Sequence, residues 1–176
     1  MFRWEKLGLL FEPLKIKDRF WLKEFAQAPS VVIFEKFVRV YFSCRPAPDK
    51  NGQYVSYSGY VDLNRGDLFE ILRVSENPIL ELGECGTFDE FGTYPVSVIK
   101  KENEYIAYYG GWTRCESIPF TVAIGIAISN DEGKTFQKIG KGPIISPSVK
   151  EPFVLSGPKI RKFNNKWYLW YVAVTE

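Results

Sequence analysis

The sequence predicts an all-β protein in which four-stranded antiparallel sheets repeat along the chain. Three observations support this fold class. Short segments alternate between apolar and polar residues, turn residues (Gly, Pro, Asn and Asp) separate these segments, and the same order of segments recurs about every 65 residues. No sustained helical periodicity is present, and only residues 20–27 (FWLKEFAQ) are compatible with a single helical turn.

The most regular repeated segment is a pair of strands that contains a proline near its start. It occurs at residues 28–43, 94–110 and 157–172, with an alternating apolar run, a polar turn and an aromatic-rich second strand in each copy. The prolines lie 66 and 63 residues apart, at Pro29, Pro95 and Pro158. We therefore expect every repeat to contain an inner strand followed by a second strand.

The next repeated element is a third strand that ends in a tight turn. Residues 129–136 (SNDEGKTF) follow an apolar run, and residues 61–69 are a weaker copy. Gly133 can adopt a positive φ and Asp131 can accept backbone N–H bonds, so this sequence motif predicts a hairpin. It also resembles the Asp-box of sialidases and other β-propellers, with Phe136 where Trp is commoner.

An outer strand completes the repeat. It is expected to begin at Trp4, Phe69 and Phe136, and each copy leads to a proline that lies 65 residues from the next one. Four features that recur in one order at one period are the sequence signature of a repeat architecture.

The repeat units therefore cover residues 4–68, 69–135 and 136–176, and the third unit is incomplete. A four-stranded sheet repeated radially is the blade of a β-propeller. We predict that residues 1–176 form one partial β-propeller domain of about two and a half blades, out of an expected five.

The last predicted strand, residues 167–176, is strongly apolar and would be a free sheet edge. Exposed apolar edges invite association with other strands. We expect the ring to be completed either by a C-terminal half of a longer protein or by a second copy of the chain in a homodimer.

The composition excludes several function classes. The chain has no histidine, which removes Ser-His-Asp and Cys-His nucleophile systems and histidine-based metal sites. Its three cysteines show no CxxC spacing, so neither a disulfide framework nor a zinc site is expected. Two of them, Cys85 and Cys115, are expected to be buried or partly buried thiols.

The charge and hydropathy of the sequence bear on whether the protein binds nucleic acid or a membrane. The net charge is +2, with acidic and basic residues interspersed, so we expect no nucleic-acid partner and no membrane binding. No apolar run reaches the length of a membrane span, and the N-terminus has no signal-peptide pattern. These features favour a cytoplasmic location.

Longer segments resemble the five-bladed propeller glycosidases, the superfamily of glycoside hydrolase families 32, 43, 62, 68 and 130. The similar stretches are residues 25–45, 86–112, 123–136 and 157–172. The resemblance implies that a glycoside binds in an axial pocket, with carboxylates projecting from the inner strands. The resemblance is also compatible with a Ca²⁺ ion at the propeller axis, although no spacing of residues in this sequence requires a metal or another cofactor.

The chain departs from that superfamily at one position. An Asp often precedes the proline of an inner strand in those hydrolases, whereas Ala28, Tyr94 and Gly157 stand there in this sequence. Ordinary hydrolysis is therefore in doubt unless the acids lie elsewhere.

Acidic residues do lie in the loops that lead into the inner strands. They are found five to seven residues before each proline, at Glu24, Asp89, Glu90 and Glu151. Glycoside hydrolysis needs one protonated and one ionised carboxyl group beside the bond. We predict that Asp89 or Glu90 supplies one catalytic carboxylate and Glu151 the other, and that Glu24 contacts substrate. The alternative is that these acids are solvated or stabilise turns.

Four further residues are predicted to bind substrate. Trp112 can stack on a sugar face, and Arg114 can bind a carboxylate, a phosphate or a sugar hydroxyl. Arg45 stands at the corresponding strand end of the first repeat, and Tyr94 precedes the second inner-strand proline. The alternative is that Trp112 packs between blades and that the arginines are surface charges.

The sequence therefore predicts a carbohydrate-active protein that resembles glycoside hydrolases, and leaves open whether it cleaves or only binds. Two alternatives are a non-catalytic glycan-binding propeller and a protein-interaction scaffold.

Overall fold

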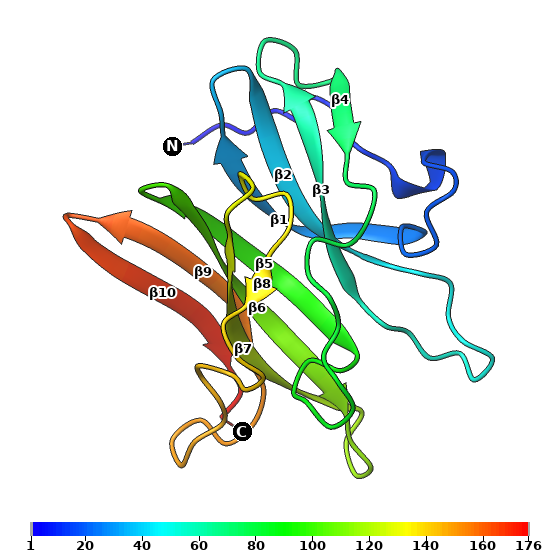
Figure 1. Cartoon of the computed structure of the whole chain (residues 1–176), viewed down its shortest axis with the longest axis vertical. Helices are drawn as coiled ribbons and strands as arrows, with labels where there is room; N and C mark the ends of the chain where they lie inside the picture. Colours follow the sequence, from blue (N-terminus) through cyan, green and yellow to red (C-terminus); the bar gives the residue numbers. More distant parts are fainter. Residues whose placement is uncertain (1, 176) are drawn as a thin grey trace.

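The structure, a computed structural model, describes residues 2–175 and consists of β-strands joined by turns and loops (Figure 1). The first sheet is antiparallel and contains four strands in sequence order. They are β1 (Glu24–Ile33), β2 (Phe37–Arg45), β3 (Tyr57–Asn64) and β4 (Ile71–Val74). A short 3₁₀ turn, η1 (Pro13–Lys15), precedes them.

The second sheet repeats the topology of the first, with four antiparallel strands in sequence order. They are β5 (Gly92–Lys101), β6 (Glu104–Arg114), β7 (Phe120–Ser129) and β8 (Gln137–Lys138). A two-stranded antiparallel sheet follows, made of β9 (Leu155–Phe163) and β10 (Lys166–Ala173). The all-β prediction and the four-stranded antiparallel sheets are confirmed, while the number of blades in the complete ring stays a prediction.

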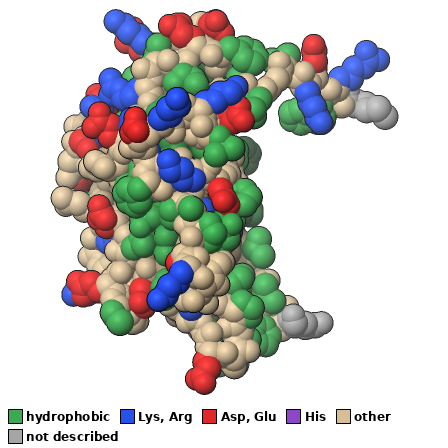
Figure 2. All heavy atoms as spheres, turned by 90° about the vertical axis from the view of Figure 1, so that its right-hand side faces the viewer, with side chains coloured by type: hydrophobic (Ala, Val, Ile, Leu, Met, Phe, Trp, Pro, Cys, Tyr) green, Lys and Arg blue, Asp and Glu red, His purple; other side chains and the backbone are tan. Residues whose placement is uncertain are grey.

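The outer strands close the sheet that precedes them in the chain. β4 pairs with β3 and β8 pairs with β7, close to the positions predicted from Phe69 and Phe136. The strand predicted to begin at Trp4 is not formed, and Trp4 is 93% exposed. An outer strand needs a neighbouring third strand for its hydrogen bonds, and residues 2–10 have none among the described residues. This segment projects from the body near the top of Figure 2.

The predicted helical turn at residues 20–27 is also wrong. Trp21 and Leu22 are fully buried, and residues from Glu24 onward belong to β1. Phe25 and Ala28 have positive φ values of 66° and 52° at two irregularities in the pairing of β1 with β2. A β-bulge supplies these dihedral angles and lets a proline enter the strand.

The sheets are held together by a core of apolar and aromatic side chains. Tyr41 and Tyr60 of the first sheet pack against Val96, Tyr105 and Phe136 of the second sheet and its turn. A second cluster, in which Trp21, Leu22 and Phe42 are buried, covers the first sheet with the segment that precedes β1.

A buried ion pair links the first sheet to the turn before β8. The Arg39 guanidinium donates to both Asp62 carboxylate oxygens, at 2.7 and 2.8 Å, and to the Glu132 carbonyl at 2.8 Å. It also lies 3.9 Å from the centroid of the Tyr60 ring. Arg39 is 1% exposed, and such burial is tolerated because its charge and donors are satisfied.

The predicted hairpin turn at residues 129–136 is confirmed in its hydrogen bonds. One Asp131 carboxylate oxygen accepts the backbone N–H groups of Lys134 and Thr135, at 3.0 and 2.9 Å. Gly133 has a φ of 75°, and its carbonyl accepts the Tyr41 hydroxyl at 2.9 Å. The turn therefore anchors the second sheet on the first.

Serine side chains bring the inner strands β1, β5 and β9 side by side. Ser30 of β1 accepts the Val98 N–H of β5 at 3.2 Å, and Ser97 of β5 accepts the Ile160 N–H of β9 at 3.3 Å. These bonds satisfy backbone groups that a free sheet edge would leave unpaired.

No helix among residues 2–175 is both long enough and apolar enough to cross a membrane.

Candidate functional site

Two adjoining cavities lie where the inner strands begin and the second strands end. In Figure 1, β5 and β9 begin toward the lower end of the view, where β6 also ends. The cavities have volumes of about 260 and 420 Å³ and share Arg45, Trp112 and Phe120. We call them together the strand-end cavity, with the polar and aromatic lining Arg45, Tyr54, Tyr94, Trp112, Arg114 and Phe120.

Arg45 is the last residue of β2 and is held in place by three neighbours. Its Nε donates to the Ser56 hydroxyl at 3.3 Å. Its guanidinium carbon lies 5.4 Å from the Phe25 ring centroid and 5.2 Å from that of Tyr54. Contact with two aromatic rings restricts the plane of the guanidinium.

Arg114 occupies the corresponding position at the end of β6. Its guanidinium carbon lies 4.0 Å from the centroid of the Phe91 ring, and Nη2 donates to the Tyr54 carbonyl at 2.9 Å. Neither Arg114 nor Arg45 forms an ion pair with an acidic residue within the described part of the chain. Both arginines therefore retain donors for a ligand.

Trp112 both packs against its neighbours and lines the strand-end cavity. Its ring centroid lies 6.1 Å from that of Phe91 and 6.3 Å from that of Phe120. Its indole covers Gly92, where any β-carbon would collide with the ring. Tyr94 lines the smaller cavity and is joined to Pro95 by a cis peptide bond. Trp112 therefore packs against residues in or next to its own sheet and lines the cavity, and its role in substrate binding stays a prediction.

Glu24 lies beside this cavity. It begins β1 and is the register partner of Arg45. Interaction with the Glu24 carboxylate raises the pKa of the Tyr54 hydroxyl. The structure thus brings four of the predicted binding residues together around the cavity and places the fifth, Glu24, next to Tyr54.

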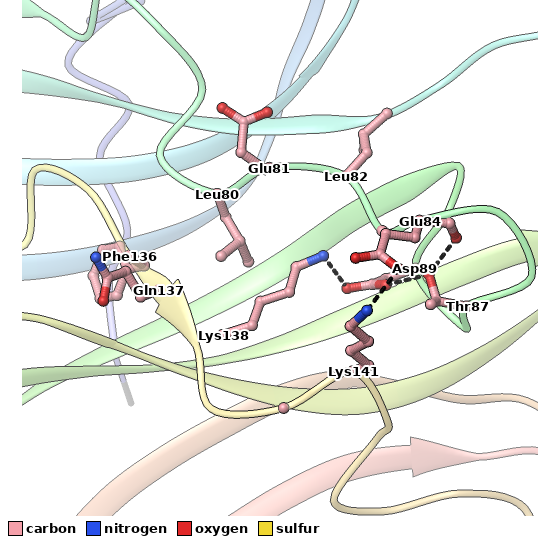
Figure 3. Close-up of a pocket in the computed structure, with 12 residues that line it drawn as sticks. Leu80, Glu81, Leu82, Glu84, Thr87, Asp89, Phe136, Gln137, Lys138 and Lys141 are labelled. Carbon is pink, nitrogen blue, oxygen red and sulfur yellow. Dashed lines mark hydrogen bonds and ion pairs between the residues drawn. The ribbon is translucent and has the colours of Figure 1, made fainter.

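Asp89, the first choice for a catalytic acid, lies in another cavity of about 430 Å³ (Figure 3). This loop cavity is formed by the segment from Leu80 to Asp89 and by residues around β8. Asp89 is 1% exposed. Its Oδ2 accepts the Tyr109 hydroxyl at 2.9 Å and the Lys138 ammonium at 2.6 Å, and its Oδ1 accepts the Thr87 hydroxyl at 3.1 Å.

These contacts make Asp89 an anchor for the loop. Both carboxylate oxygens are engaged, one by Lys138 and Tyr109 and the other by Thr87. Burial, together with the charge and hydrogen bonding of Asp89, raises the pKa of Tyr109. Figure 3 shows Lys141 and Glu84 paired near this network, at 2.7 Å.

The other two predicted catalytic acids have different surroundings. Glu90 accepts the backbone N–H of Gly86 at 2.9 Å, within its own loop. Glu151 accepts the Tyr171 hydroxyl at 3.0 and 3.2 Å, and this interaction raises the pKa of Tyr171. Glu90 and Glu151 line neither the loop cavity nor the strand-end cavity. The geometry gives Asp89, Glu90 and Glu151 separate partners, and their catalytic roles stay predictions.

The expectation of buried thiols is wrong for Cys85 and Cys115, which are both exposed. They lie in loops next to glycine-rich and strand-end segments, where no packed layer covers them. Cys44 is buried, and burial raises the pKa of its thiol to about 11. Cys115 also lines the larger part of the strand-end cavity.

Sequence reasoning missed Tyr54, Phe120 and Lys138. Tyr54 lies in a loop with no counterpart in the other repeats, and Phe120 begins a strand whose turn differs between repeats. Lys138 reaches Asp89 from a strand 49 residues away in the chain. Among the described residues, no group of three or more acidic or cysteine side chains is arranged to hold a metal ion.

Comparisons with known proteins bear on the family. No family model matches the chain. An uncharacterized protein of Mycobacterium tuberculosis, Rv1502, is 31% identical over 169 residues, which cover 96% of this chain and 54% of that protein. A β-1,2-mannobiose phosphorylase of Thermoanaerobacter is 25% identical over 115 residues, covering 60% of this chain and 38% of that enzyme. The chain spans about half the length of the first of these relatives.

Solved structures share the fold at low sequence identity. A putative glycoside hydrolase from Parabacteroides distasonis has a TM-score of 0.65 and 16% identity, over 90% of this chain and 48% of that one. The Bombyx mori family 32 β-fructofuranosidase BmSUC1 has a TM-score of 0.65 and 12% identity, over 88% of this chain and 30% of that one. The chain therefore shares the fold of these glycoside hydrolases, which is the fold that its sequence resemblance implied.

Proposed function

We propose that this chain is part of a carbohydrate-active protein and that it binds a glycan in the strand-end cavity. The supporting comparisons are the glycoside hydrolase fold and the partial similarity to a mannobiose phosphorylase. A fold alone hosts many functions, so the argument rests on the site.

The observation that carries the proposal is the combination of aromatic and unpaired polar groups in one cavity. Trp112 and Tyr94 offer faces on which the C–H groups of a sugar ring can pack. Arg45 and Arg114 offer hydrogen-bond donors for ring substituents, since no acidic residue among residues 2–175 neutralises them. A largely apolar cavity with a few fixed polar groups is typical of a small-molecule site.

Cleavage of the glycan is the finer prediction. It requires two carboxyl groups on either side of the scissile bond, about 5–9.5 Å apart. The strand-end cavity has Glu24 beside it, whereas Asp89 contacts Lys138 in the loop cavity. Binding is therefore the function that the geometry supports best, and catalysis by Asp89, Glu90 or Glu151 remains a prediction for direct kinetic tests.

A glycan array followed by calorimetric titration tests the proposal. We expect at least one glycan to bind, and Trp112→Ala to weaken its binding by about tenfold or more because a stacking face is lost. The matched control is Trp167→Ala, since Trp167 lies on β10 and lines neither part of the strand-end cavity. Binding that Trp112→Ala leaves unchanged would place the sugar elsewhere, and absence of any bound glycan would contradict the proposal.

A further inference from the structure

Two arginines from neighbouring sheets meet at the strand-end cavity, and one loop residue joins them. Arg45 ends β2 of the first sheet and Arg114 ends β6 of the second. Tyr54 contacts both, because its ring lies beside the Arg45 guanidinium and its carbonyl accepts the Arg114 Nη2 at 2.9 Å. Both side chains line the same cavity of about 420 Å³.

Both guanidinium groups are oriented but incompletely used. Arg45 donates through Nε to Ser56, and its two terminal nitrogens have no hydrogen-bond partner among the described residues. Arg114 donates through Nη2, which leaves its Nε and Nη1 without a partner within the same residues. A guanidinium offers five N–H donors in a fixed plane that matches the geometry of a carboxylate or phosphate.

Arg39 has a structural role and provides a comparison for the two arginines of the cavity. Arg39 is buried, and Asp62 neutralises it through two hydrogen bonds. All three arginines lie beside aromatic rings, but Arg45 and Arg114 lack the carboxylate partner that Arg39 has. Stacking on a ring orients a cation without neutralising its charge.

Two acidic residues in this region, Glu24 and Asp49, have other partners. Glu24 interacts with the Tyr54 hydroxyl. The Asp49 carboxylate accepts the backbone N–H groups of Asn51 and Gln53, at 2.8 and 2.9 Å, and Arg114 contributes to the lowering of its pKa. Neither acid comes within ion-pair distance of Arg45 or Arg114.

We propose that the strand-end cavity selects a glycan that carries an oxyanion, either the carboxylate of a uronic acid or a phosphate or sulfate ester, held between Arg45 and Arg114. This inference rests on the proposed function, since Trp112 must stack on the sugar that bears the charge. Trp112 and the two guanidinium groups line the larger of the two adjoining cavities, so the ring and its charge can bind together. Hydrogen bonds to a charged acceptor are stronger than those to a hydroxyl.

The experiment compares matched ligand pairs by calorimetry at constant ionic strength. The probes are methyl glucoside against methyl glucuronide, mannose against mannose 6-phosphate, and inorganic phosphate alone. We expect the anionic member of at least one pair to bind about tenfold or more tightly than its neutral partner, because charged hydrogen bonds replace neutral ones. The pair that responds distinguishes a uronate from a phosphate ester.

Substitutions assign the preference to the two arginines. Arg114→Gln and Arg45→Gln should remove most of the preference for the anionic sugar, while Arg45→Lys keeps the charge and loses the planar fork. Arg73→Gln is the control, since Arg73 lies exposed on β4 and outside this cavity. Unchanged thermal unfolding midpoints would show that each variant is folded.

The possible failures can be told apart. If neutral and anionic sugars bind equally and Trp112→Ala weakens both, the proposed function stands and the oxyanion inference is wrong. If inorganic phosphate binds as tightly as the sugar phosphate and Trp112→Ala has no effect, the site holds an adventitious ion only, and the inference is overturned. If no member of any pair binds and the glycan array is also negative, both the inference and the proposed function are refuted.

Discussion

The loop cavity around Asp89 and the larger part of the strand-end cavity, around Arg114, have similar volumes of about 430 and 420 Å³, but their charged groups differ in their partners. In the loop cavity, the buried carboxylate has a lysine, a tyrosine and a threonine as partners. In the strand-end cavity, two guanidinium groups lack an acidic partner among residues 2–175. Cavity size therefore does not distinguish the two regions, whereas unused hydrogen-bonding capacity sets the proposed binding site apart.

The energetic roles of the two regions should differ accordingly. A buried charge whose partner is removed is strongly destabilising, whereas a partly exposed charge that has no ionic partner can be neutralised at little cost. The following predictions test this comparison, beginning with the largest expected effect.

Removing the Asp89 charge should cost the most stability. Asp89→Asn leaves the Lys138 ammonium, whose side chain is 19% exposed, without its counter-ion. We expect the free energy of unfolding to fall by about 3 kcal/mol. Urea denaturation measures it, and Arg114→Gln is the matched control, with an expected loss below about 0.5 kcal/mol.

A double variant separates the ion pair from the packing around it. Asp89→Leu combined with Lys138→Met should recover part of the loss because no unpaired charge remains. If Asp89→Asn leaves stability unchanged but abolishes turnover on an aryl glycoside, the anchoring role is wrong and the catalytic prediction for Asp89 gains support.

A smaller effect is expected at the turn that Asp131 caps. Burial disfavours its charged form, but hydrogen bonds from Ser129, Thr135 and Lys134 outweigh burial and lower the pKa of Asp131 below its ordinary value. The folded pKa is therefore below the unfolded one. The resulting stabilisation is fully present above the unfolded pKa, and is lost as pH falls through the folded pKa.

Stability should accordingly decline as the pH falls below the ordinary pKa of an aspartate, and the stability of Asp131→Asn should decline less steeply there. Urea midpoints measured across the acid range give both slopes. Equal slopes for the wild type and the variant would show that the turn does not contribute to the acid sensitivity.

The smallest expected effect is a change in the labelling rates of two cysteine thiols, one in each region. Cys85 lies in the loop between Glu84 and Asp89, and Cys115 lines the strand-end cavity. Both are exposed and should react with an aromatic disulfide reagent, while buried Cys44, with its raised pKa, should not.

A glycan that binds in the strand-end cavity should slow the labelling of Cys115 several-fold and leave Cys85 unaffected. Cys85→Ser and Cys115→Ser variants identify which thiol reacts. Protection of Cys85 instead would move the binding site to the loop cavity and reverse the comparison.

Residues that specify a local conformation could be recognised from the sequence alone. Gly133 and Asp131 specify a turn by themselves, because a positive φ and short-range hydrogen bonds depend on neighbouring residues only. The placement of Arg45, Trp112 and Arg114 near one pocket followed from their equivalent positions at strand ends. By contrast, residues 2–10 have the pattern of an outer strand but form none, because a strand also needs a hydrogen-bonding neighbour.

The sequence alone predicted the all-β class, most of the strands and the turn at residues 129–136, since alternation, proline spacing and glycine positions act over a few residues. Only the tertiary structure decided the state of each charged group. Lys138 reaches Asp89 from a distant strand, and the Tyr54 carbonyl reaches Arg114 from another sheet. Whether a charge is satisfied or available depends on contacts between segments far apart in the chain, and no local pattern records those contacts.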